Sequence, residues 1–118
     1  MTELIACLST GKGTWGHVAR LLQDQRWGKV YLLTNEYGKE NFHTSNNVEL
    51  VTINENMGIK ELRDDIKVKL QSKITGSEVA VNFISGSGKE HMTLVSALLQ
   101  LGVAIRFVAL TKDGIEEI

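Results

Sequence analysis

The feature that most constrains this chain is the regular alternation of short apolar runs with stretches of helical period. The apolar runs occupy Glu3–Ser9, Lys29–Asn35, Val48–Ile53, Glu78–Ile84 and Val103–Leu110. Four of them are almost continuously hydrophobic, which is typical of parallel strands that are covered on both faces. The run "NVELVTIN" alternates more clearly, which indicates a strand at or near a sheet edge. The pattern therefore predicts a mainly parallel sheet of five strands.

Three stretches between these runs have helical period, namely Thr14–Arg26, Gly58–Ile74 and Lys89–Leu101. Thr14 is the expected N-cap of the first helix, and Gly102 is expected to end the third. The third helix is apolar around most of its circumference. One of its faces should therefore cover the sheet, and the other should form a subunit interface.

The remaining segments complete a Rossmann-like, doubly wound α/β domain over residues 1–118. Residues 36–47 connect the second and third strands, and they either form no helix where one is usual or contain only a short one. Asp113-Gly114 forms a turn after which a short antiparallel strand can follow the last parallel one. Three main helices and right-handed connections are expected.

Composition excludes several classes of function. A net charge of −1 over 118 residues gives no basis for a general affinity for long nucleic acids or for anionic membranes. The only cysteine, Cys7, rules out a disulfide framework and a cysteine-based zinc site, and its apolar surroundings predict burial. The three histidines are scattered, with no carboxylate at ligand spacing, so no metal site is predicted. Without a leader-like start or an apolar segment of ~18 residues, the expected location is cytoplasmic.

Two loops at the ends of predicted strands carry the functional signal. The first strand leads into "STGKGTWG" and the fourth into "SGSGKEH". If the winding starts from a central first strand, these loops lie side by side, and ligands of such sheets bind there. Glycines that open a helix expose backbone N–H groups, and hydroxyls and lysines add donors and charge, which predicts a phosphate site. The candidate ligand-binding residues are Ser9, Thr10, Gly11, Lys12, Gly13, Thr14, Ser85, Gly86, Ser87, Gly88, Lys89 and His91.

Two other functions stay open. Gly11-x-Gly13-x-x-Gly16 has the spacing of a dinucleotide-binding loop, and Glu36 lies at the distance expected of a carboxylate that binds the ribose. Against an NAD-type function, the glycines do not follow the strand directly, and no second domain is expected that would hold a substrate. The third possibility is a non-catalytic interaction module, in which the apolar helix binds a partner and the glycine loops are only tight turns.

The loops resemble those of the CRISPR-associated Rossmann-fold (CARF) domain family. Members of that family have a Ser/Thr-Gly loop after the first strand, as in Ser9-Thr10-Gly11. After the fourth strand they have Ser/Thr-Gly-Gly-Thr-Lys and an apolar helix with an early methionine. This chain has "SGSGK" over residues 85–89 and then Met92, with Ser87-Gly88 in place of Gly-Thr. The "LLTNE" that ends the second strand, with Thr34 and Asn35 as further ligand-binding candidates, is also similar to the family pattern.

The resemblance implies a homodimer that binds a cyclic tetra- or hexa-adenylate and acts in antiviral defence, without a cofactor. The chain has no ribonuclease motif of its own, so a separate CRISPR effector is a possible partner. Some stand-alone relatives cleave the ring without metal, by attack of a ribose 2′-hydroxyl on the adjacent phosphate. By motif, Ser9 would orient that phosphate and Lys89 would stabilise its developing charge. Tyr37, Phe42 and His43 are candidates for contact with the adenines.

Overall fold

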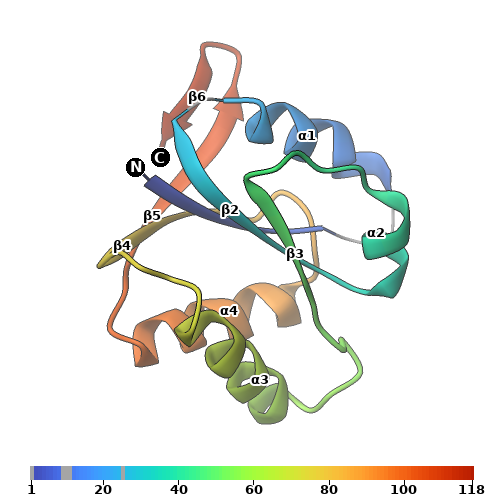
Figure 1. Ribbon diagram of the computed structural model, residues 1–118, viewed down its shortest axis with the longest axis vertical. Coiled ribbons are helices and arrows are strands. Elements are labelled where there is room, and N and C mark those ends of the chain that lie inside the picture. Colours follow the sequence, from blue (N-terminus) through green and yellow to red (C-terminus); the bar gives the residue numbers. More distant parts are fainter. Residues whose placement is uncertain (1, 9–11, 25) are drawn as a thin grey trace.

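The strands of the described residues form one six-stranded sheet in the order β3-β2-β1-β4-β5-β6 (Figure 1). The computed structural model describes residues 2–8, 12–24 and 26–118, and for residue 12 the backbone alone. The first five strands are parallel, and β6 runs antiparallel to β5. Their bounds are β1 Thr2–Cys7, β2 Trp27–Thr34, β3 Val48–Thr52, β4 Glu78–Asn82, β5 Ala104–Thr111 and β6 Gly114–Glu117.

Helices cover both faces of this sheet. They are α1 (Trp15–Leu22), α2 (Glu36–Asn41), α3 (Ile59–Gln71) and α4 (Gly88–Gln100), with a 3-10 turn, η1, at Lys12–Thr14. Figure 1 shows α3 and α4 next to each other below the sheet and α1 on the opposite side. None of the helices in the described part of the chain is long and apolar enough to cross a membrane.

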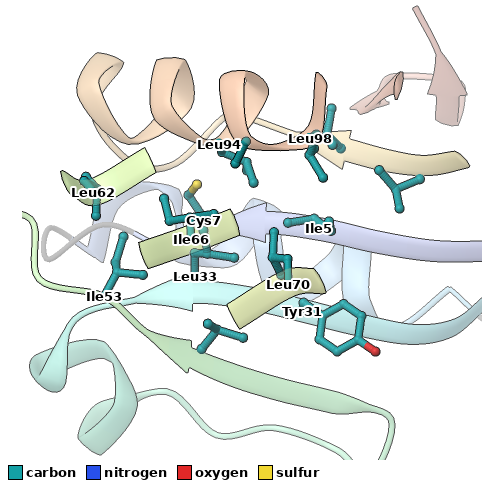
Figure 2. Packing of buried hydrophobic residues seen from close by; sticks show 14 residues of the cluster. Ile5, Cys7, Tyr31, Leu33, Ile53, Leu62, Ile66, Leu70, Leu94 and Leu98 are labelled. Carbon is teal, nitrogen blue, oxygen red and sulfur yellow. The ribbon is translucent and has the colours of Figure 1, made fainter. Parts of the chain in front are cut away.

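Successive side chains of a strand point to opposite faces of the sheet. The central strands therefore contribute to two separate hydrophobic cores, one on each face. On the α3 and α4 side, Ile5 and Cys7 of β1 pack against Leu94 and Leu98, as Figure 2 shows. On the α1 side, Leu4 and Ala6 join a cluster that includes Val18 and Leu21. A central strand buried on both faces explains why its sequence is continuously apolar.

The predicted α/β class and mainly parallel sheet are confirmed, and the number of helices differs slightly from the prediction. β3 is an edge strand, as its alternation indicated. Gly114 (φ +107°) follows Asp113 in the turn that brings β6 against β5, and Gly102 (φ +74°) follows α4. The 36–47 segment contains the short helix α2, which gives four helices where three main ones were expected.

One helix start differs from the prediction. Thr14 occupies the N-cap position of α1, but its side chain makes no capping hydrogen bond. Its backbone dihedrals, φ −104° and ψ 0°, are not the extended ones of a capping residue, because the η1 turn runs directly into the helix.

Gly86 is the glycine whose replacement should damage this fold. Its φ is +102°, and a Cβ there would lie 2.9 Å from Cβ of Cys7. We expect Gly86→Ala to lower the free energy of unfolding by about 2 kcal/mol, measured by urea denaturation. Gly88→Ala is the control, because no described atom lies within 4 Å of the added Cβ. Equal stability of the two variants would contradict the packing of this loop against β1.

Candidate functional site

The direction of winding reverses between β1 and β4. From β1 the chain builds the sheet outward through β2 and β3, and it then returns to the other side of β1 with β4 and β5. The predicted adjacency of the first and fourth strands is therefore confirmed. Ligands of open parallel sheets bind beyond the carboxyl ends of the strands at such a reversal.

The loop after β4 lies directly against the end of β1. The ideal Cβ position of Gly86 is 2.9 Å from Cβ of Cys7, 3.0 Å from Nε2 of His91 and 3.3 Å from Oε1 of Glu90. The facing loop is described only from residue 12 onward. Ser9, Thr10 and Gly11, and the side chain of Lys12, lie outside the described residues.

Side chains on both sides of the sheet hold the loop after β4 in place. Asn82 is buried, its Nδ2 donates to the carbonyl of Val108 (2.9 Å), and its Oδ1 accepts from the N–H of Ile84 (3.2 Å). His91 Nε2 lies 2.8 Å from the carbonyl oxygen of Ser85. Since a carbonyl only accepts, Nε2 carries the proton. The loop is therefore fixed at its start and at its turn.

The helix that follows is capped by its own residues. Ser87 Oγ accepts from the N–H of Glu90 (3.2 Å), and the Glu90 carboxylate accepts from the N–H of Ser87 (2.7 Å). This capping box satisfies two of the N–H groups that an anion at the helix start would use. Glu90 is buried and directly follows Lys89. Its carboxylate therefore lies beside the predicted phosphate site. Sequence reasoning missed this residue, although the Ser-x-x-Glu spacing of residues 87–90 signals it.

Lys89 connects the start of α4 to the loop after β3. Its Nζ donates to the carbonyl of Glu55 (2.9 Å), and the Glu55 carboxylate accepts from Nδ2 of Asn35 (3.1 Å). Glu55 thus joins the end of β2 to α4, and two predicted site residues contact it, Asn35 at its carboxylate and Lys89 at its backbone carbonyl. No local motif singles Glu55 out; its only signal is that it follows a predicted strand at the same edge of the sheet.

Thr34 is wholly buried. Its Oγ1 donates to the carbonyl of Leu8 (3.3 Å), so this hydroxyl holds the ends of β1 and β2 together. A Cβ on Gly38 would come within 1.8 Å of the same hydroxyl oxygen. Of the two residues predicted at the end of β2, Asn35 therefore lies in the accessible polar region, and Thr34 belongs to the packed interior.

The start of α1 contains two buried polar atoms that lack partners. Thr14 Oγ1 and His17 Nε2 have no hydrogen-bond partner within the described ranges. A buried polar atom left unpaired costs about 1–3 kcal/mol, so a bound group that pairs with it recovers part of that free energy. Both residues follow the glycine loop after β1.

Aromatic rings flank the carboxyl end of β2. The Trp15 ring lies 6.1 Å from Tyr37 and 5.5 Å from Phe42, measured between centroids. Tyr37 is 40 % exposed and His43 is exposed, whereas Phe42 is partly buried against the α1-side core. Tyr37 is the member of the cluster that offers a ring to a ligand.

The outer face of α4 carries a groove of about 620 Å³. It is lined by Phe83, His91, Met92, Val95, Ser96, Leu99 and Gln100. Met92 and Leu99 are each more than half exposed, while Leu94 and Leu98 on the inner face are buried. The helix is thus apolar on two faces, as predicted, and the sheet covers one of them.

The described residues contain no group of three His, Cys, Asp or Glu side chains that could hold a metal ion. No protein-family model matches the sequence, and a comparison with curated proteins finds no match. The described residues at the carboxyl ends of the strands are therefore the basis for assigning a function.

The Cys7 thiol should report on closure of the loop after β4. Burial, and then the charge of Glu90, raise the pKa of Cys7 well above its usual range. We expect a thiol reagent at pH 8 to label the native protein at least a hundredfold more slowly than the urea-unfolded protein, because only the exposed thiolate reacts. Mass spectrometry of timed samples measures both rates. Fast labelling of the native chain would mean that the loop does not seal the end of β1.

Proposed function

We propose that two copies of this chain bind a cyclic oligoadenylate in the crevice between the loops that follow β1 and β4. The observation that carries the proposal is the reversal of winding at β1 and β4, with a helix opening from each loop. The unpaired atoms of Thr14 and His17 support a polar ligand on the α1 side, and the Lys89 ammonium supports an anionic ligand on the α4 side.

Opposite charges at the start of α4 set the strength of phosphate binding. Lys89 attracts a phosphate, and the neighbouring buried Glu90 carboxylate repels it. Lys89 must also give up the carbonyl of Glu55 to reach a ligand. A single phosphate should therefore bind weakly, and a ring that presents several phosphates to two copies of the site should bind much more tightly.

The outer groove of α4 supports the dimer. An exposed apolar groove on a helix that is otherwise buried favours contact with a second apolar surface. In a twofold dimer, the same groove of both copies meets at the axis. A ring with twofold symmetry fits such an axis, because each half then contacts identical residues.

Cleavage of the ring is a further step of the proposal. A ribose 2′-oxygen would form a bond to the adjacent phosphorus, and the bond from phosphorus to the 5′-oxygen would break, with the 2′-proton finally carried by that leaving oxygen. Lys89 would stabilise the charge on the phosphoryl oxygens. Ser9 would orient the phosphate. Such a step needs positioning more than a shifted pKa, so the same residues serve a chain that only binds the ring and one that also cleaves it slowly.

A dinucleotide is the second candidate ligand, favoured by the position of Glu36. This carboxylate is the first residue of α2, directly beyond β2 and next to the reversal point. It is the place where NAD-binding folds bind the ribose. Saturable NAD binding, with none for cyclic adenylates, would favour this candidate over the first.

Loss of the Lys89 charge should weaken binding. We expect the wild-type chain to bind cyclic tetra- or hexa-adenylate, and Lys89→Ala to bind about tenfold more weakly or worse, because a charge-assisted contact to phosphate is lost. Calorimetric titration measures the affinity, and chromatography of the incubated ring detects cleavage. Absence of binding by either ring would overturn the proposed function.

Two control variants make this test specific. Lys112→Ala removes an equal charge from the exposed β5–β6 turn and should leave the affinity unchanged. Glu90→Gln keeps the hydrogen-bond acceptor for Ser87 and removes the negative charge, so it should bind the ring roughly threefold to tenfold more tightly. A weaker Glu90→Gln complex would contradict a phosphate beside this carboxylate.

A charge on the outer face of α4 should separate the subunits. We expect Leu99→Glu to be monomeric in sedimentation velocity at concentrations where the wild type is a dimer, because a carboxylate would be buried without a partner. Val68→Glu is the matched control, since Val68 is equally exposed on α3 but outside the groove. A dimer that survives Leu99→Glu but not Val68→Glu would place the interface on α3.

A further inference from the structure

We propose that the polar hollow beyond the ends of β2 and β3 binds the base and ribose of an adenosine. This inference rests on the proposed function: the adenosine would belong to the ring whose phosphate Lys89 contacts. It assigns a second subsite to a region that the phosphate argument does not use.

The hollow has a volume of about 520 Å³, which lies in the range of small-molecule sites. Its polar lining comes from the residues that follow two neighbouring strands: Asn35, Glu36, Tyr37, Asn54, Glu55 and Asn56. Asn54 Oδ1 accepts from the N–H of Asn56 (3.0 Å), which shapes the loop after β3. The hollow is thus built on strand ends that pair in register at Thr34 and Thr52.

One residue separates the hollow from the phosphate site. Glu55 contacts Asn35 through its carboxylate and Lys89 through its carbonyl. A nucleotide is long enough to reach across Glu55, from the hollow on the Asn35 side to the phosphate site on the Lys89 side. A phosphate near Lys89 and a nucleoside in the hollow are therefore compatible with one ligand.

The chemistry of the lining matches adenine. Asn56 is the lining asparagine whose side-chain amide can present one donor and one acceptor side by side, which pairs with N7 and the N6 amino group of adenine. The Asn35 amide is bound to the N–H of Gly38 and to Glu55, and Asn54 Oδ1 accepts from the N–H of Asn56. Guanine presents two acceptors on that edge and is matched by Arg or Lys. Lys69, the one lysine among the described lining residues, is already bound to the carbonyl of Thr52 and to Asp65.

Two further groups of the hollow can contact the face of the base and the ribose hydroxyls. The exposed ring of Tyr37 provides a surface on which a base can stack. The Glu36 carboxylate can accept hydrogen bonds from ribose hydroxyls, as acidic residues at the end of a second strand do in related topologies. Stacking, edge contacts and ribose contacts thus have separate residues within one hollow.

A titration followed by NMR tests the location directly. Adenosine monophosphate and ribose 5-phosphate are added separately to the full chain with assigned amide resonances. We expect both to shift resonances of residues 85–89, and the adenosine compound alone to shift those of residues 35–37 and 54–56. Equal effects of the two compounds on the hollow, or no shift there, would overturn the inference.

Variants test whether the hollow contributes to binding of the ring. Tyr37→Ala and Glu36→Ala should each weaken cyclic tetra-adenylate binding by about tenfold. Glu40→Ala removes an equal charge from α2 outside the hollow, and it should change nothing. If the wild type binds the ring and both variants keep full affinity, the adenosine subsite is wrong and the phosphate site stands. If the wild type binds no ring, the proposed function fails and the subsite falls with it.

Discussion

The parallel pairing of β1 with β4 is the contact on which the rest of the structure depends. It joins Leu4, Ile5 and Ala6 to Ala80, Val81 and Asn82, so that strands far apart in sequence become neighbours. β1 also pairs with β2, so the sheet extends from β1 in both directions. The loop after β4 therefore lies at the end of β1, where Gly86 approaches Cys7. Packing of α1 on one face of the sheet and of α3 and α4 on the other keeps these strand ends together.

The start, the inner face and the outer face of α4 have different surroundings. Its start carries adjacent opposite charges, Lys89 and Glu90, and the capping box of Ser87 and Glu90 satisfies backbone groups of its first turn. Its inner face fills the core, and its outer face remains an apolar groove. His91 belongs to both the groove and the loop, since its ring stacks on Phe83 and its Nε2 bonds to Ser85. A partner that covers the groove would therefore contact a residue that holds the loop after β4 in place.

The loop after β3 connects the start of α4 to the polar hollow beyond the ends of β2 and β3. Glu55 joins the end of β2 to the start of α4, and the neighbouring asparagines line the hollow beyond it. Each of these contacts links segments that are tens of residues apart in the chain. They use a backbone carbonyl and polar or charged side chains, which leave little trace in a hydrophobic pattern.

The sequence by itself determined the alternation of strands and helices, the edge position of β3, the turn at Asp113-Gly114 and the two loops at the ends of the first and fourth strands. These features are local, because periods of two and 3.6 residues and glycine conformations are written in neighbouring residues. Only the tertiary structure decided that Thr34 is buried against the end of β1 and that Glu55 lies between Asn35 and Lys89. Such hydrogen bonds depend on where separate strand ends meet, and the local pattern of one segment does not specify its distance from another.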